Sequence, residues 1–297
     1  MINDYIKSPI NYMGCKYPLL PQILPFFPKE IDTFLDVFGG SGTVSFNVKA
    51  ENIIYNDYIP YIQDIFKTWK SMKADDIVDY CRQYLNVNIE DFVKLRDEYN
   101  KTRDPNLLFI LICYSYNGQF RFNSKHEYNS SFAMGIRTLN DNIIHNIIKC
   151  KPIIDKITYI NKDFREIDYN GLTQNSLVYL DPPYSISVGV YQDGKRGFNG
   201  WSKQDDLDLF DLCDTLNAQN IPFAMSNLFS GKELQNDELI RWSKKYTVYH
   251  LNISYNQTNR TKSIQKDDEV LIVNYDRAKT NAHKLLQFKI KDGKIIN

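Results

Sequence analysis

The chain has 297 residues, of which 43% are hydrophobic and 24% are charged, with 36 basic side chains against 36 acidic ones. The length fits one large domain or a domain that carries an insertion, and the composition is that of a globular protein. The formal net charge of zero argues against a surface that attracts nucleic acid everywhere, although it allows a local basic face.

Seven short runs of strand-forming residues recur along the chain, and each ends at or near a polar residue. They are Thr33–Phe38, Asn52–Asp57, Ile157–Asp163, Ser176–Asp181, Ile221–Asn227, Tyr246–Asn252 and Asp268–Asn274. Apolar strands separated by helical patterns predict an α/β fold with a mostly parallel sheet covered on both faces. A polar loop joins the last two runs, so we expect them to form an antiparallel hairpin.

Two segments between these runs have clear helical patterns. The first runs from Tyr61 to Met72 and places one apolar stripe at helical spacing. The second begins at Ser202–Asp205, which resembles a capping box, and continues with apolar residues at helical spacing. We therefore expect one helix after the second strand and another before the fifth.

The region 71–149 breaks the alternation, because it has helix signals and no clear strand. Asp104 and Pro105 predict a helix start, and the apolar run Leu107–Tyr114 predicts a buried helix too short to span a membrane. A polar, turn-rich stretch follows Tyr116. We predict a helical insertion at 71–149 within a domain formed by 1–70 and 150–297.

The carboxyl ends of the predicted parallel strands carry four acids: Asp36, Asp57, Asp163 and Asp181. Ligands of open α/β sheets bind at this edge. One acid after one strand is common in caps and turns, but four on one edge exceed what caps require. The sequence therefore predicts a polar ligand site there.

A glycine-rich turn, Phe38–Thr43, follows the first strand. Its glycines allow a tight turn and a close approach to a ligand, and we expect a helix after it to offer free N–H groups. The turn matches neither a dinucleotide fingerprint nor a phosphate-binding loop. Asp57, about 20 residues further on, is placed to accept hydrogen bonds from ribose hydroxyls. Together they predict a nucleoside ligand with a small charged end.

The string Asp181-Pro182-Pro183-Tyr184 ends the fourth strand. Asp181 and Pro182 both precede a proline, so their backbone is held extended and their oxygens point in fixed directions. Two adjacent acceptors suit an –NH2 group, and Tyr184 offers a flat face to a planar ring. The alternative is a rigid turn with Tyr184 packed in the core.

These motifs, in this order, resemble those of Dam-type (alpha-class) adenine-N6-specific DNA methyltransferases. The resemblance rests on the Asp181–Tyr184 string, the Asp36–Gly42 turn, the early stretch Asn11–Tyr17 with its lysine, and the recognition-like stretch Tyr116–Lys125, and it covers about 7–275. It implies a Rossmann-like class I methyltransferase with a seven-stranded sheet, a helical target-recognition insertion and S-adenosylmethionine as the methyl donor.

The resemblance also implies roles for individual residues. Those that would border the cofactor are Tyr12, Lys16, Asp36, Phe38, Gly39, Gly40, Ser41, Asp57, Asp163, Phe164 and Asp181. The catalytic group would be Asp181, the Pro182 carbonyl and Tyr184, with the target base flipped out and stacked on Tyr184. Duplex DNA would meet Tyr116, Asn117, Gln119, Arg121, Asn123, Lys125 and Arg137, where Arg pairs with guanine and Asn or Gln with adenine.

The sequence leaves several features of the protein open. GATC is one candidate target, although Gln119 and Asn129–Phe132 depart from common GATC members. The setting could be restriction-modification, an orphan enzyme or a phage. Lys195, Arg196, Lys203, Arg260 and Lys262 could meet phosphate. The basic stretch from Arg277 could carry a small strand at 286–290.

The remaining expectations concern partners and location. Five scattered cysteines, no CxxC pair and no signal-like segment after Met1 predict reduced thiols in a bacterial or phage-infected cytoplasm. Scattered histidines predict no metal site, and we expect a monomer or a dimer on DNA. The rivals are an enzyme acting on RNA or a protein amide, for which Asn-Pro-Pro-Tyr would be usual, and a non-catalytic DNA-binding relative.

Overall fold

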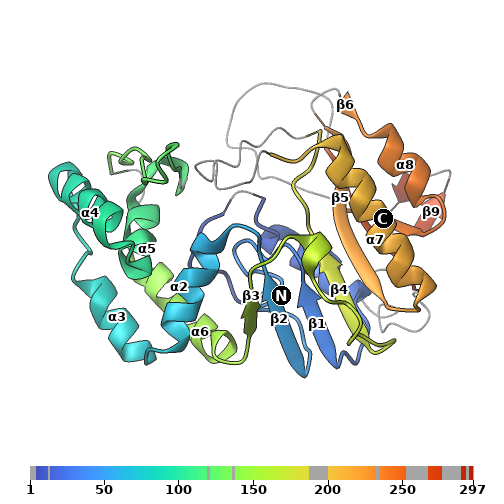
Figure 1. Ribbon diagram of the computed structural model, residues 1–297, viewed down its shortest axis with the longest axis horizontal. Helices are drawn as coiled ribbons and strands as arrows, with labels where there is room; N and C mark the ends of the chain where they lie inside the picture. Colours follow the sequence, from blue (N-terminus) through green and yellow to red (C-terminus); the bar gives the residue numbers. More distant parts are fainter. Residues whose placement is uncertain are drawn as a thin grey trace.

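A computed structural model describes residues 5–12, 14–118, 121–135, 138–186, 200–231, 234–251, 267–275, 289–291 and 294–296 (Figure 1). Within these ranges the chain forms a central sheet with helices on both faces and a group of helices at one end (Figure 1).

The central sheet has the strand order β3-β2-β1-β4-β5-β8-β7. Its strands are β1 (Thr33–Asp36), β2 (Asn52–Asn56), β3 (Thr158–Ile160), β4 (Ser176–Leu180), β5 (Phe223–Gly231), β7 (Thr247–Leu251) and β8 (Asp268–Val273). The first five of these are parallel, whereas β8 runs antiparallel to both β5 and β7. The α/β fold and the antiparallel last hairpin are thus confirmed. A short strand that we did not predict, β6 (Leu234–Gln235), pairs with the end of β5.

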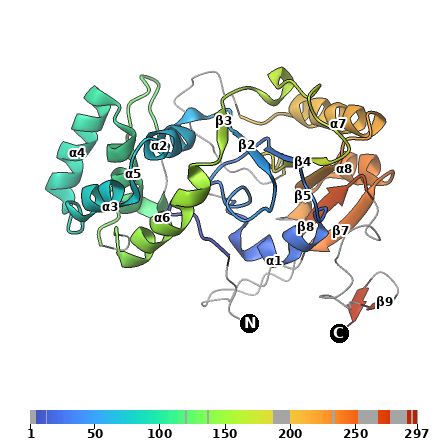
Figure 2. The same ribbon diagram turned by 90° about the horizontal axis from the view of Figure 1, so that it is seen from below.

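Successive side chains of the central strands face two different cores, as the pleat of a strand requires. Phe34, Leu177 and Tyr179 belong to one core, which is covered by α1 (Leu20–Ile23), α2 (Pro60–Lys70) and other helices. Leu35 and Val178 belong to the other, which is covered by α7 (Lys203–Ala218) and α8 (Asp237–Ser243). Figure 2 shows α1 and α7 on opposite sides of these strands. This burial on both faces explains why the strand sequences are continuously apolar.

The two helices predicted from their patterns are confirmed. Helix α2 buries its apolar stripe, which consists of Ile62, Ile65, Phe66 and Trp69. Helix α7 begins with a complete capping box, in which the Ser202 side chain accepts from the Asp205 N–H and the Asp205 carboxylate accepts from the Ser202 N–H. Helix α8 lacked a clear sequence pattern because it is short, although Asn236 caps its first turn by accepting from the Leu239 N–H.

Four helices follow α2 before the chain returns to β3: α3 (Ala74–Arg82), α4 (Ile89–Thr102), α5 (Pro105–Tyr114) and α6 (Asp141–Ile154). Helices α3, α4 and α5 gather at one end of the molecule (Figure 1). Asp104 caps α5 as predicted, and all residues from Leu107 to Tyr114 are buried. Helix α6 continues past residue 149, so the predicted end of the insertion falls inside a helix. A separate recognition domain stays a prediction.

The ends of the chain add smaller elements. Near the start, two 3-10 turns, η1 (Tyr17–Leu19) and η2 (Leu24–Phe26), flank α1. Near the end, β9 (Lys289–Lys291) and β10 (Lys294–Ile296) form an antiparallel pair, so the predicted small strand is present in part. In the described part of the chain, no helix has the length and apolar character needed to cross a membrane.

The helix predicted after the glycine-rich turn is wrong. Residues 43–47 form turns instead, with the Phe46 N–H donating to the Gly42 carbonyl at 2.8 Å. The Asn47 side-chain amide donates to the Thr43 carbonyl at 2.8 Å, while the Asn47 backbone N–H donates to the Val44 carbonyl at 3.0 Å. A side chain thus replaces the backbone donor that a continuing helix would use.

Candidate active site

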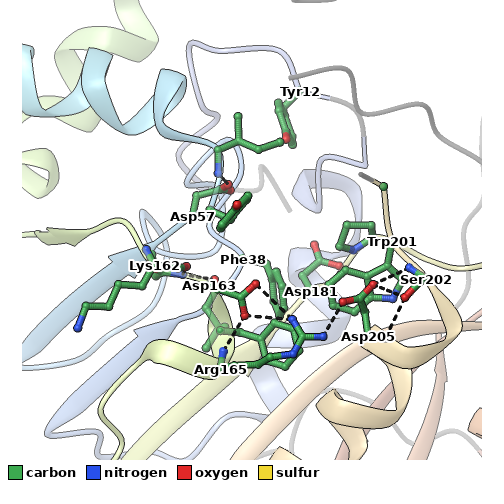
Figure 3. A pocket seen from close by; sticks show the side chains of 17 residues that line it. Tyr12, Phe38, Asp57, Lys162, Asp163, Arg165, Asp181, Trp201, Ser202 and Asp205 are labelled. Atoms are coloured by element: carbon green, nitrogen blue, oxygen red, sulfur yellow. Dashed lines mark hydrogen bonds and ion pairs between the residues drawn. The ribbon is translucent and has the colours of Figure 1, made fainter. Parts of the chain in front are cut away.

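A cavity of about 330 Å³ lies beyond the carboxyl ends of β1, β2 and β4 (Figure 3). This is the topological switch point of the sheet, because the strands that follow β1 are added first on one side (β2, β3) and then on the other (β4, β5). Open α/β sheets bind ligands at such a point. Residues that line it are Tyr12, Val37, Phe38, Asn56, Asp57, Tyr58, Ile59, Lys162, Asp163, Phe164, Arg165, Asp181, Pro183, Gly200, Trp201, Ser202 and Asp205. Its volume is in the range of pockets for small organic ligands.

The glycine-rich turn and Asp57 are joined directly. The Gly40 N–H donates to Asp57 Oδ2 at 2.8 Å, and the Ile59 N–H donates to Oδ1 at 2.8 Å. Gly40 has φ +50, a conformation that side chains other than glycine rarely adopt. Burial raises the pKa of Asp57 to about 6, against the lowering effect of these two N–H groups. Each carboxylate oxygen keeps a further lone pair for a ligand hydroxyl.

Three aromatic rings form an apolar wall of the cavity. The ring centroids of Phe38 and Phe164 are 5.8 Å apart, those of Phe38 and Trp201 are 5.6 Å apart, and those of Phe164 and Trp201 are 5.8 Å apart. The Trp201 Nε1–H donates to Asp206 Oδ1 at 2.7 Å, which fixes the indole. Such a wall suits a flat heterocycle such as a nucleobase.

An ion-pair cluster closes the cavity beside this wall. Arg165 pairs with Asp163 at 3.1 Å, with Asp205 at 2.5 Å and with Asp208 at 2.7 Å. Its guanidinium carbon lies 4.2 Å from the centre of the Phe164 ring. Figure 3 shows Arg165 joined to Asp163 and to Asp205 among the residues that line the cavity. The cluster thus connects the turn after β3 to the start of α7.

Asp181 directly follows β4 and belongs to a largely buried group of polar side chains. Lys16 Nζ lies 2.8 Å from Asp181 Oδ1 and 3.5 Å from Glu269 Oε1, and it donates to the Gly14 carbonyl at 3.1 Å. The Tyr184 hydroxyl is 3.1 Å from Asp181 Oδ1 and 2.9 Å from Glu269 Oε1. Burial raises the pKa of Asp181, the Lys16 charge and hydrogen bond lower it, and the Glu269 charge raises it.

The structure brings six of the predicted cofactor residues to the cavity wall, namely Tyr12, Phe38, Asp57, Asp163, Phe164 and Asp181. The others lie close by but not on that wall. Gly39 packs so tightly that a Cβ there would lie 2.1 Å from the Tyr55 ring. Ser41 and Lys16 are buried.

Asp36 also lies off the wall of the cavity. It is 1% exposed, accepts from the Ser45 hydroxyl at 2.6 Å, and has its pKa raised to about 7 by burial. Its place is beneath the turn, so a direct ligand contact stays a prediction.

Two further residues belong to the predicted catalytic set. The Tyr184 hydroxyl is hydrogen-bonded to Asp181 and Glu269, and Lys16 Nζ lies 5.0 Å from the centre of the Tyr184 ring. Pro182 is buried.

Sequence reasoning missed several residues of the site. Trp201 lies just before α7, Asp205 lies in the first turn of α7, and Arg165 follows β3. Their places in the site become clear only once these elements meet. Glu269 was missed because β8 runs antiparallel, so its amino end, not its carboxyl end, lies at the edge of the sheet where the site is.

The predicted DNA contacts lie in a turn-rich segment packed on α2 and α4. Tyr116, Arg121 and Lys125 are exposed. Asn117 has φ 55, and its carbonyl accepts from the Asn11 side chain at 3.3 Å. The Asn123 side chain accepts from the Lys125 and Glu127 N–H groups, so it builds the turn.

This segment is held to the rest of the molecule by side chains. Phe122 stacks on Tyr61 of α2, with ring centroids 3.9 Å apart and 12° between the rings. Asn100 of α4 donates to the Tyr128 carbonyl at 3.1 Å and accepts from its N–H at 2.7 Å. Gln119 and Arg137 lie outside the described residues, as do Lys195, Arg196, Arg260 and Lys262. Lys203 pairs with Glu238 at 2.8 Å.

The doubly wound sheet, with a cavity at its switch point, defines a Rossmann-like α/β protein. The model of the D12 class N6 adenine-specific DNA methyltransferase family matches residues 12–281. The chain therefore belongs to the D12 class of N6 adenine-specific DNA methyltransferases.

Three curated relatives agree with this family. The chain is 38% identical over 281 residues to the type II methyltransferase M.FokI of Planomicrobium okeanokoites. The aligned residues cover 92% of this chain and 43% of that relative. It is 37% identical over 295 residues to the modification methylase StsI of Streptococcus sanguinis, with 96% of this chain and 45% of that relative aligned. It is 26% identical over 228 residues to the DNA adenine methylase of Escherichia coli K12, with 73% of this chain and 79% of that relative aligned. The chain thus spans less than half the length of the first two.

Proposed function

We propose that this chain transfers a methyl group from S-adenosylmethionine to N6 of an adenine that has been flipped out of duplex DNA. One observation carries the proposal: Asp181 of the Asp-Pro-Pro-Tyr string lines the same cavity as Asp57 and the aromatic wall. A nucleoside ligand bound at Asp57 and an amine bound at Asp181 would thus share one space.

The residues of the cavity fit S-adenosylmethionine. Asp57 suits its ribose, and Phe38, Phe164 and Trp201 suit its adenine. The tight turn at Gly39 and Gly40 lets the backbone approach its methionine part, and a Cβ on Gly40 would lie 3.2 Å from the Tyr12 ring. When bound, the cofactor supplies a methyl group that the amine nitrogen takes up, while the methyl–sulfur bond breaks, its electron pair stays on sulfur, and the amine releases a proton.

The adenine amine is a weak nucleophile because its lone pair is delocalised into the ring. Asp181 and the Pro182 carbonyl would each accept one of its two N–H groups, which favours a pyramidal nitrogen with a directed lone pair. Asp181 contacts Lys16 and Tyr184 through Oδ1, so Oδ2 is not needed for those contacts. The protein would contribute mainly positioning and electrostatic stabilisation.

DNA would bind across the segment that follows α5. The support is chemical: Arg121 and Lys125 are exposed cations on a folded turn, and Tyr116 of the same segment is 51% exposed. Arg121 would read a base edge, and Tyr116 with Asn117 would border the space left by the flipped base. The recognised sequence, for which GATC is one candidate, is left to experiment.

The test compares Asp181→Asn with Asp268→Asn, which removes a carboxylate that pairs with His250 at 2.7 Å on the surface. We expect Asp181→Asn to slow methyl transfer to DNA by at least about 100-fold, with a smaller loss of S-adenosylmethionine affinity measured by calorimetry. Asp268→Asn should behave like the wild type. Near-normal transfer by Asp181→Asn would refute the role of Asp181.

A further inference from the structure

Glu269 reaches the site from an unexpected direction. It is the second residue of β8, which runs antiparallel to β5 and pairs Glu269 with Leu228 in β5. The start of β8 therefore lies at the same edge of the sheet as the carboxyl ends of β4 and β5. Its side chain is only 8% exposed, and burial of a carboxylate is costly unless the group has partners.

Glu269 contacts Tyr184, which belongs to the predicted catalytic group, and Lys16, which was predicted to border the cofactor. Its Oε1 accepts from the Tyr184 hydroxyl at 2.9 Å and lies 3.5 Å from Lys16 Nζ. Both partners also contact Asp181 Oδ1, at 3.1 Å and 2.8 Å. Glu269 and Asp181 thus share a hydroxyl and an ammonium group, which come from the loop after β4 and from the segment before η1.

We propose that Glu269 is a positioning residue for methyl transfer, which holds Lys16 and Tyr184 so that they fix the Asp181 carboxylate through Oδ1. The inference rests on the proposed function and extends it to a residue on a different strand. Lys16 contacts Oδ1 from one side, and Tyr184, whose single hydroxyl proton is shared between Glu269 Oε1 and Asp181 Oδ1, contacts it from another. These contacts restrict rotation of the carboxylate and so favour one direction of Oδ2 for the target amine. A misplacement of about 1 Å at such a group costs about 100-fold in rate.

Glu269 also changes the electrostatic environment of Asp181, in addition to holding Lys16 and Tyr184 in place. Asp181 and Glu269 contribute two negative charges and Lys16 one positive charge. Other titratable groups that act on Asp181 or respond to it are Tyr184, Tyr179 and Asp36. Since the Glu269 charge disfavours ionisation of Asp181, its removal should let Asp181 ionise at lower pH.

The experiment compares Glu269→Gln, Glu269→Ala and Asp268→Asn in the full chain. Gln keeps an acceptor for the Tyr184 hydroxyl but removes the charge, whereas Ala removes both. Asp268→Asn removes the neighbouring carboxylate of the same strand. Single-turnover methyl transfer is measured from pH 5 to pH 9, and the Asp181 carboxyl carbon is titrated by carbon-13 NMR without cofactor or DNA, with Asp181→Asn to assign the signal.

We expect Glu269→Ala to lower kcat by about 100-fold, with a change in S-adenosylmethionine affinity below about 3-fold. Glu269→Gln should lower kcat less, move the acid limb of the rate to lower pH and shift the Asp181 titration in the same direction. Asp268→Asn should change none of these quantities.

Wild-type transfer to adenine N6 together with an unmoved limb and titration in Glu269→Gln would overturn the role of Glu269 and leave the proposed function intact. An equal loss in Asp268→Asn would likewise reduce Glu269 to a structural residue. A wild-type chain that transfers no methyl group to adenine would instead overturn the proposed function, and the role of Glu269 with it.

Discussion

Replacing Gly39 with alanine tests how tightly the glycine-rich turn supports the cavity. A Cβ on Gly39 would lie 2.1 Å from Tyr55 Cε2 and 2.4 Å from Cδ2. Tyr55 is fully buried and donates its hydroxyl to the Gly40 carbonyl at 2.6 Å. The ring therefore cannot move aside without losing a buried hydrogen bond.

The cost follows from this contact. Overpacking of a core by one carbon atom costs about 1–3 kcal/mol, and loss of the Tyr55 hydrogen bond adds to it. We expect Gly39→Ala to lower the free energy of unfolding by that amount. Because Gly40 donates to Asp57, a displaced turn should also weaken S-adenosylmethionine binding by about 10-fold, which corresponds to about 1.4 kcal/mol.

Urea unfolding and calorimetric titration with S-adenosylmethionine measure the two quantities. Gly171→Ala is the matched control, since a Cβ there would meet nothing within 4 Å. If Gly39→Ala matched Gly171→Ala in both stability and affinity, the turn would not be the rigid support that we describe.

Two further predictions concern stability and DNA binding. Burial raises the pKa of Asp36 to about 7 from 3.8, so the folded state keeps a proton that the unfolded chain loses, and stability should fall as pH rises between these values, by roughly 4 kcal/mol at most. Asp36→Asn should therefore stabilise the protein at pH 8 but not at pH 4 in urea unfolding; an equal effect at both would contradict the raised pKa. Tyr61→Leu removes the stack on Phe122, worth about 0.5–1.5 kcal/mol, so it should weaken DNA binding up to about 10-fold in fluorescence anisotropy while S-adenosylmethionine affinity stays unchanged. Equal DNA affinity would show that the Phe122 segment does not bind DNA.

Much of the fold could be predicted from the sequence because local signals agreed with the tertiary structure. The strand from Ser176 to Leu180 is buried at every position and apolar from Leu177 on, because both faces of the sheet are covered. The capping box at Ser202 and the cap at Asp104 both form as their residue types predict. At such positions the local chemistry and the global packing favour the same conformation.

The missed features depend on contacts that no local pattern encodes. The helix expected after the glycine-rich turn is absent because Asn47 bonds both to Thr43 and to the distant Ile6. Trp201 joins Phe38 and Phe164 only when α7 packs on the sheet. Glu269 could be assigned to the site only with knowledge of the direction of β8 in the sheet, since the rule that ligands lie at the carboxyl ends of strands holds for parallel strands alone.

The central claim is that this cavity brings an adenine amine of DNA to Asp181. Its most direct test is to incubate the chain and S-adenosylmethionine with duplex DNA of randomised sequence, then to detect methylated bases at single-base resolution. We expect N6-methyladenine within one short sequence context, and we expect it to be lost in Asp181→Asn. Methylation of cytosine, methylation of RNA or protein alone, or binding of DNA without any methyl transfer would contradict it.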